Sequence, residues 1–330
     1  MWRRLFPLLI PCLILTVDHT SAQESKSKRI IRIGVTQTVS FVDFDADAKG
    51  FEKALAEAGF KEGTHVNFDR QNAQGEVRNA QAIAQKFLDT KVDLIHSIAT
   101  PSSLAVVKII NNVPIVFSSV TDPVDAGLIP KTSPPGTKTG TNVTGVSDRW
   151  PVFLQFEMYT KFFPKAKKWG TIYNPGDPKS ILYIKEMREA AKKLGVELIE
   201  ATISSSAETL QTVQSLSGRA QAIHITFDYI AIASFDTIVK ICNEKKIPLF
   251  GGDLKCVSRG AMAAYGWDYF QIGYAAGRKA AQILRGEKPG DIPWELGEKL
   301  VLLINEKAAK TQGAVISPEL FKKADKVITE

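Results

Sequence analysis

The chain repeats one strand–helix alternation, and this repeat constrains its fold more than any other feature. A β-branched run at 30–35 precedes apolar residues at helical spacing over 45–58, and the alternation continues to about residue 118. It begins again at 168–173, beyond a Pro-, Gly- and Thr-rich stretch at 133–140. Strands that take turns with helices predict a parallel sheet with helices on both faces. We therefore expect an α/β protein with two Rossmann-like lobes.

Matching segments in the two halves indicate lobes of similar plan. Residues 93–96 (DLIH) correspond to 221–224 (QAIH), and residues 113–117 (VPIVF) correspond to 247–250 (IPLF). The 330 residues also exceed the size of about 250 to 300 residues at which a single hydrophobic core stops growing. Open parallel sheets bind ligands at the carboxyl ends of their strands, so two facing lobes predict one cleft between two such edges.

The expected organisation is a signal peptide followed by two lobes that share three hinge crossovers. The hinge strands are expected near 145–150, 265–267 and 304–305. The expected limits are 1–22 for the signal peptide, 23–148 plus 267–303 for lobe one, and 149–266 plus 304–330 for lobe two. Each lobe is then built from two separate stretches of sequence.

The first 22 residues have the composition of an export signal. Arg3 and Arg4 precede an apolar run at 5–17, and residues 20–22 are small enough for a signal peptidase site. The apolar run is shorter than the ~20 residues that cross a bilayer as a helix. We expect the mature protein in the periplasm or otherwise outside the cytoplasm, reached by either the general secretory or the twin-arginine route.

The charge pattern argues against nucleic-acid binding. The formal net charge is +7, but Lys and Arg are scattered along the chain without an arginine-rich run or an aromatic-basic pattern. The hydrophobic share of 44% and the charged share of 23% are typical of a soluble globular protein. Cys242 and Cys256 remain in the mature chain and form either a disulfide or two buried thiols.

The sequence offers few of the parts that an enzyme needs. His96 and His224 lie inside expected strands, where core packing explains them better than catalysis. Cys and His residues do not have zinc spacing, no Gly-rich phosphate loop follows the first strand, and the Gly-x-Ser-x-Gly motif is absent. We therefore expect a binding protein without catalytic activity, cofactor or metal.

Several motifs together resemble those of a known family. The chain resembles the transporter substrate-binding proteins with a type I periplasmic binding fold, whose known ligands include tryptophan and other aromatic amino acids. The resemblance covers nearly all of the mature chain and implies a monomeric extracytoplasmic receptor that hands its ligand to an ABC permease in the inner membrane. The motifs are 72–75 (NAQG), 99–101 (ATP), 114–117 (PIVF), 120–124 (VTDPV), 142–148 (NVTGVSD) and 173–175 (YNP).

One loop departs from the family pattern. Typical members carry a His-Pro pair after the glutamine that ends the first strand, whereas here Gln37 is followed by Thr38-Val39-Ser40-Phe41. This loop is expected to face the cleft. The expected ligand therefore widens from an aromatic amino acid to an amino acid or similar small zwitterion with an aromatic or apolar side.

The candidate ligand-binding residues follow strands in both lobes. Thr100 is expected to cap a helix and to leave the amides of Ser102 and Ser103 free for a carboxylate, although it also fits a purely capping role. The lobe-one candidates are Gln37, Phe41, Thr100, Ser102, Ser103, Ser119 and Thr121, and the lobe-two candidates are Asn174, Phe227, Asp228, Tyr229 and Asp253.

An ammonium group that enters the cleft needs a carboxylate partner, because an unpaired buried charge costs several kcal/mol. Asp228 is the first choice and Asp253 the second, while each also fits the role of a helix cap. Phe41, Phe227 and Tyr229 offer either flat apolar walls for the ligand or ordinary core packing.

These features favour a solute-binding protein of an ABC importer that closes two lobes around its ligand. A second function uses the same cleft: a periplasmic ligand sensor that docks on a receptor kinase or a chemoreceptor. The sequence does not separate the two, since they differ only in the outer surface that the partner contacts.

Overall fold

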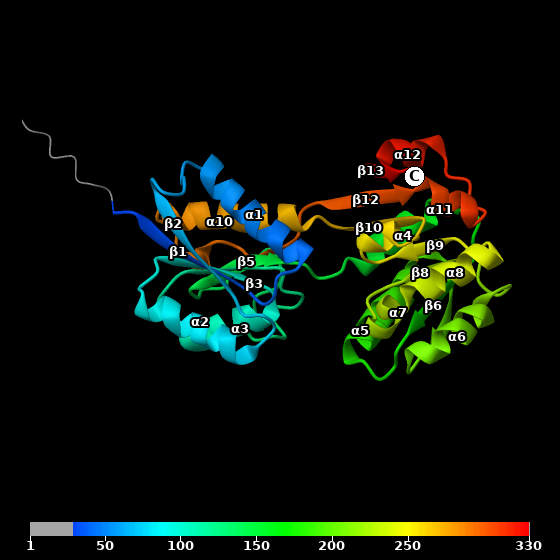
Figure 1. Ribbon diagram of the computed structural model, residues 1–330, viewed down its shortest axis with the longest axis horizontal. Coiled ribbons are helices and arrows are strands. Elements are labelled where there is room, and N and C mark those ends of the chain that lie inside the picture. The colour runs from blue at the N-terminus through cyan, green and yellow to red at the C-terminus, as the bar shows by residue number, and fades with distance from the viewer. Residues whose placement is uncertain (1–28, 330) are drawn as a thin grey trace, which may run out of the picture.

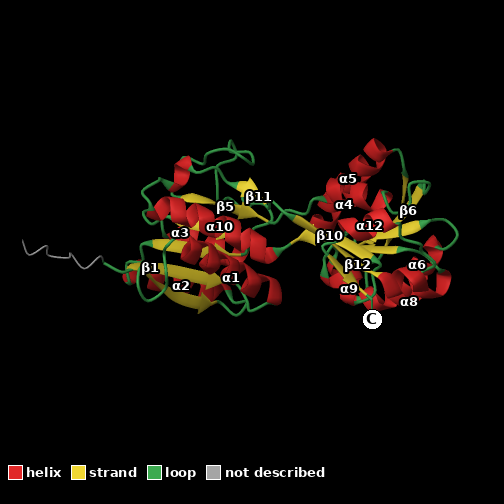
Figure 2. Cartoon of the chain, turned by 90° about the horizontal axis from the view of Figure 1, so that it is seen from above, coloured by secondary structure: helices red, strands yellow, loops and turns green. Residues whose placement is uncertain are grey.

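The computed structural model describes residues 29–329, which form two lobes joined by crossover segments (Figure 1). The expected signal peptide at 1–22 lies outside the described residues. Each lobe contains one sheet with helices on both faces, as Figure 2 shows from above. This arrangement confirms the expected two-lobed α/β fold.

The first sheet has six strands, and all of its neighbouring strands pair in parallel. In spatial order they are β11 (Glu295–Leu296), β5 (Val143–Ser147), β4 (Ile115–Ser118), β3 (Leu94–Ile98), β1 (Ile31–Gln37) and β2 (Val66–Asn72). The central strands β3 and β4 are buried along their whole length, so both faces of each strand carry mostly apolar residues, with His96, Ser97 and Ser118 as buried polar exceptions.

Two helix pairs cover this sheet. They are α1 (Val42–Glu57) with α10 (Tyr269–Leu284), and α2 (Val77–Asp89) with α3 (Thr100–Ile109). The first pair buries Phe51, Leu55 and Ile272 against the sheet. The second pair packs around Phe87 and Val106 in a separate core on the opposite face.

The second sheet has seven strands, all in parallel pairs except for one antiparallel pair near an edge. In spatial order they are β13 (Lys326–Ile328), β12 (Leu300–Asn305), β10 (Ala263–Trp267), β9 (Leu249–Gly251), β8 (Ala222–Ile225), β6 (Lys168–Tyr173) and β7 (Glu197–Thr202).

Helices also cover both faces of the second sheet. One core contains α4 (Val152–Thr160), α5 (Pro178–Leu194), α11 (Glu306–Thr311) and α12 (Pro318–Lys323). The other contains α6 (Thr209–Leu216), α7 (Tyr229–Ala233), α8 (Phe235–Lys245) and α9 (Lys255–Ser258). Two short 3-10 helices complete the fold at Ser206–Glu208 and Pro289–Asp291.

Glycines bring α1 and α10 unusually close together. A Cβ atom on Gly273 would overlap the Asp47 carbonyl oxygen, and one on Gly50 would overlap that of Phe270. Only glycine permits such close backbone approach. The packing fixes the middle of α1 against the first half of α10.

The chain crosses between the lobes after β5, after β10 and after β11. The third crossover lies at 297–299, so the expected hinge strand at 304–305 is wrong and residues 300–303 belong to the second sheet. β12 pairs antiparallel with β10 from Leu300 opposite Trp267 to Ile304 opposite Ala263. An apolar run predicts a buried strand, but it does not say which of two sheets the strand joins.

Two further observations complete the description of residues 29–329. Within this range, no helix is both long and apolar enough to cross a membrane. Cys242 and Cys256 are free thiols in the α8 and α9 core, and burial raises the pKa of each to about 12. The second of the two alternatives for these cysteines therefore holds in this structure.

Candidate functional site

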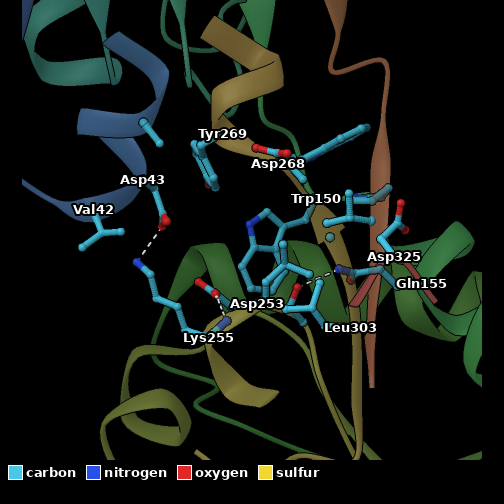
Figure 3. Close-up of a pocket in the computed structure, with 17 residues that line it drawn as sticks. Val42, Asp43, Trp150, Gln155, Asp253, Lys255, Asp268, Tyr269, Leu303 and Asp325 are labelled. Carbon is cyan, nitrogen blue, oxygen red and sulfur yellow. Dashed lines mark hydrogen bonds and ion pairs between the residues drawn. The ribbon is translucent and has the colours of Figure 1, made fainter. Parts of the chain in front are cut away.

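A cavity of about 340 Å³ lies between the lobes beside the crossovers (Figure 3). We call it the hinge cavity. Its walls come from the first turn of α1, the crossover segments, the loop between β9 and α9, and β12. Residues that contribute to its lining include Asp43, Trp150, Gln155, Asp253, Lys255 and Tyr269. Both lobes therefore shape one cavity.

Lys255 links the two lobes at the mouth of the hinge cavity. Its Nζ donates to Asp43 Oδ2 on α1 over 2.6 Å and lies 3.4 Å from the centre of the Phe41 ring. Burial raises the pKa of Asp43, while Lys255 partly offsets this effect. The Asp253 carboxylate accepts the Lys255 backbone amide over 2.7 Å. The predicted residues Phe41 and Asp253 therefore meet here, on either side of a lysine.

The carboxylate of Asp148, in the first crossover, has one unused oxygen. Its Oδ2 accepts the Tyr269 hydroxyl over 3.0 Å, whereas Oδ1 is buried and has no hydrogen-bond partner within residues 29–329. Burial raises the pKa of Asp148, and Tyr269, Lys179 and Thr121 partly offset this effect. An unpaired buried carboxylate oxygen is rare and unfavourable unless something else supplies its partner.

An aromatic cluster covers the wall of lobe two next to this carboxylate. The Trp150 ring centre lies 5.9 Å from that of Tyr183 and 5.4 Å from that of Phe227, and Phe227 lies 4.8 Å from Tyr229. Lys179 places its Nζ 4.4 Å from the centre of the Phe227 ring. Trp150 also lines the hinge cavity, so the cluster continues into it. The predicted aromatic residues of lobe two thus form part of one surface.

Arg149 forms a second link between the lobes. Its guanidinium donates to Asp122 in lobe one over 2.7 Å and to Glu186 on α5 over 2.6 Å. The Trp267 indole donates to the Arg149 carbonyl over 3.0 Å and so joins two crossovers. Arg149 and Lys255 thus connect the lobes through polar contacts, which can break during lobe movement.

The structure corrects the expected role of the α3 terminus. The helix begins at Thr100 itself, and Ala99, with φ of 70°, takes the cap position without a side-chain cap. The Ser102 amide donates to the Thr38 hydroxyl over 3.2 Å, and the Ser103 amide donates to the Ala99 carbonyl over 3.1 Å. Neither amide is free for a ligand carboxylate, because the altered loop after β1 occupies one and the helix occupies the other.

Two other lobe-one candidates bond within their own lobe. The Gln37 amide donates to Asp45 over 2.9 Å, outside the lining of the hinge cavity. Ser119, with φ of 53°, donates its hydroxyl to the buried Asp47. Both side chains therefore support the loops after β1 and β4 in this structure.

The structure shows Asp228 as a helix cap, which is one of its two expected roles. The residue is fully buried, and its carboxylate accepts the Ala231 amide at the start of α7 over 2.8 Å. It also accepts the Ser180 hydroxyl over 2.7 Å and the Asn174 amide over 2.6 Å. Three donors therefore satisfy Asp228 in this structure, and its choice as first partner of a ligand ammonium stays a prediction. The Asn174 side chain accepts the Gly176 amide over 2.8 Å.

Sequence reasoning missed the crossover residues and the lysines. Asp148, Trp150 and Tyr269 lie at crossovers, while Lys179 and Lys255 lie in the first turns of α5 and α9. Asp148 closes the segment NVTGVSD, which supported the family resemblance but was not assigned to the site. Residues that connect two lobes necessarily border the space between them, and this was the signal available.

Comparisons with known proteins agree with this geometry. A family model described as ABC transporter substrate binding protein matches residues 32–328. A tyrosine-binding protein from Clostridioides difficile (strain R20291) is 37% identical over 288 residues, which cover 87% of this chain and 82% of that protein.

Solved structures show the same relationship. The ligand-free, open structure of a substrate-binding protein with adhesive properties from Clostridium difficile is 36% identical, with a TM-score of 0.84 over 91% of this chain and 100% of that one. An ABC domain from Streptococcus pneumonia in complex with L-Trp is 29% identical, with a TM-score of 0.71 over the same shares. The chain therefore belongs to the ABC transporter substrate-binding proteins and has their type I periplasmic binding architecture.

Proposed function

We propose that this protein is the extracytoplasmic solute-binding protein of an ABC importer and that it closes its lobes around one amino acid with an aromatic or apolar side chain. The observation that carries this proposal is the surface that both lobes share, where the cluster around Trp150 and Phe227 continues into the hinge cavity. Aromatic faces of this kind favour flat apolar groups. The cavity of about 340 Å³ has the size of a small-molecule site.

The relatives support the ligand class. One is a tyrosine-binding protein and another contains L-Trp, and the family consists of binding proteins without catalytic activity. The loop at 38–41 departs from the family pattern, and Phe41 at its end is 47% exposed. Ligand preference within the amino acids is therefore expected to depend on this loop.

Lobe closure is expected to follow ligand binding. A ligand that contacts both lobes favours the closed form in proportion to its differential affinity for that form. The closed face then docks on the permease. The proposal also places the mature protein, as a monomer, outside the cytoplasm, where substrate-binding proteins of this family act.

Thermal unfolding of the purified mature chain tests the ligand class. L-Tyrosine, L-tryptophan, L-phenylalanine and L-leucine are compared with a sugar and a nucleoside. At 100 times its Kd, a ligand stabilises the folded state by about 2.7 kcal/mol. Stabilisation by an amino acid supports the proposal, and stabilisation by the sugar or the nucleoside alone contradicts it.

Uptake by cells tests the importer role. Deleting the gene should reduce uptake of the stabilising amino acid, and the wild-type gene should restore it. Unchanged uptake, together with loss of a response to the same amino acid, would favour the sensor function instead.

A further inference from the structure

Two charged side chains between the lobes, Asp148 and Lys179, form no ion pair within residues 29–329. Asp148 is 6% exposed, and its Oδ1 has no hydrogen-bond partner. Lys179 forms no ion pair within residues 29–329, and its Nζ lies over the Phe227 ring. The hydroxyl of Tyr183 is also buried without a partner. Three polar groups near the aromatic cluster therefore have unused hydrogen-bonding capacity.

The groups around Asp148 come from both lobes. Tyr269 belongs to α10 of lobe one, while Lys179 and Tyr183 belong to the first turns of α5 in lobe two. Lobe movement therefore changes the surroundings of this carboxylate directly. A buried carboxylate that is ionised needs an opposite charge nearby, because an isolated ion is strongly disfavoured in a dry environment.

From this arrangement, we infer that Asp148 binds the ammonium group of the ligand and that Lys179 binds its carboxylate. The inference rests on the proposed function and assigns its polar contacts. The two charges match the two ends of a zwitterion, and Trp150 and Phe227, whose ring centres lie 5.4 Å apart, supply apolar surface beside Lys179. Asp228 does not compete for the ammonium, because its three donors already satisfy it.

The assignment also links the protonation of Asp148 to ligand binding. Burial alone favours the protonated carboxyl group. A bound ammonium favours the charged form, so ligand binding and deprotonation of Asp148 support each other. A ligand that lacks the ammonium receives no such contribution.

Ligand analogues separate the two contacts. L-Tyrosine carries both charges, tyramine lacks the carboxylate, and 3-(4-hydroxyphenyl)propanoate lacks the ammonium. L-Tryptophan, tryptamine and indole-3-propanoate form a second series. Calorimetric titration measures the affinity of each compound for the wild type, for Asp148→Asn and for Lys179→Met.

The inference makes opposite predictions for the two variants. Asp148→Asn should weaken binding of the amino acid and of the amine by about 100-fold, since one desolvated charge pair is lost. The affinity for the propanoate should change by less than about 3-fold. Lys179→Met should weaken binding of the amino acid and of the propanoate, and it should affect binding of the amine less. Asp125→Asn, in an exposed loop of lobe one, and Lys185→Met, on the exposed face of α5, serve as matched controls.

The outcomes separate this inference from the proposed function. Equal binding of an amino acid by the wild type and Asp148→Asn overturns the assignment but leaves the amino-acid proposal standing. Equal weakening of all three compounds also overturns it, because that pattern indicates a structural role for Asp148. Failure of the wild type to bind any amino acid contradicts the proposed function itself. Thermal unfolding of each unliganded variant shows whether it is folded, and retained propanoate binding shows that the site is intact.

Discussion

The two lobes carry a histidine at the same place of the repeat, but they surround it differently. In β3, His96 Nε2 lies 2.8 Å from the Ser118 hydroxyl and 3.5 Å from Asp47, and its ring stacks on Phe51 at 3.8 Å. In β8, both ring nitrogens of His224 are buried and have no hydrogen-bond partner in the part of the chain that the structure describes. In lobe one the histidine therefore belongs to a polar network, whereas in lobe two it is enclosed by the hydrophobic core.

Aromatic packing replaces hydrogen bonding around His224. Its ring centre lies 4.8 Å from that of Tyr159 and 5.6 Å from that of Phe156. Burial lowers the pKa of His224 to about 3, so this histidine is neutral at any ordinary pH. The comparison teaches that a matching position in an internal repeat does not imply a matching role, because neighbouring residues decide what a buried polar group contributes.

The largest expected effect comes from removing the centre of the lobe-one network. Asp47 is fully buried and accepts the hydroxyls of Ser118 and Ser119. Asp47→Ala leaves both hydroxyls without their acceptor and His96 without its neighbouring carboxylate, so the free energy of unfolding should fall by about 4 kcal/mol. Urea unfolding measures this change. Asp47→Asn keeps an acceptor and should cost less; equal losses in the two variants would contradict the network.

Acid should destabilise lobe two through His224. The unfolded chain protonates this ring below its ordinary pKa of 6.5, whereas the folded chain does so only near pH 3. Stability is therefore complete above pH 6.5 and is lost as the pH falls through this window, by about 2 kcal/mol between pH 6 and pH 4.5. Urea unfolding at several pH values measures the slope. His224→Leu should remove this contribution, and an unchanged slope in that variant would show that other groups cause it.

Replacing the two histidines at neutral pH compares the lobes directly. His96→Leu should lower the free energy of unfolding by about 1.5 kcal/mol, because Ser118 loses a partner inside the core. His224→Leu removes two unsatisfied nitrogens and should be neutral or stabilising, within about 0.5 kcal/mol. Equal effects of the two variants on urea unfolding would remove the distinction between the lobes.

The smallest effect on stability is expected for the ion pair between the two lobes. The Lys255 side chain is 38% exposed and its partner Asp43 is 19% exposed, so their pair contributes less than about 1 kcal/mol to stability. Lys255→Met should change the angle between the two lobes measurably, whereas the melting temperature should stay nearly constant. Small-angle X-ray scattering measures this change as a shift in the radius of gyration of the unliganded protein. An unchanged radius would show that the crossovers alone hold the lobes.

The strand–helix order was predictable because its periods are local. Continuous apolar runs identify buried parallel strands, and each helix shows its own spacing of apolar residues. The sheet that contains Leu300–Asn305 was not predictable, because its pairing with β10 depends on the path of the chain through the third crossover. Local patterns therefore define the elements, while the division between lobes depends on tertiary contacts.

The candidate site was less predictable than the fold. A carboxylate after a strand suits both a helix cap and a ligand, and only the positions of the backbone amides around Asp228 distinguish the two. Asp148 directly follows β5, but the expected hinge strand at 145–150 placed it inside a strand, so strand-end reasoning did not select it. Its unused oxygen becomes visible only when the neighbouring groups from both lobes are in place.

The close packing of α1 against α10 also determines when lobe one can finish folding during synthesis on the ribosome. Residues 42–57 emerge early, yet the glycine-lined surface that they need belongs to residues 269–284. The strands and helices from 152 to 267 are continuous in sequence and emerge before residues 269–284. Phe51 and Leu55 therefore lack one of their packing partners until most of the chain is made, and the domain that begins the protein is completed late.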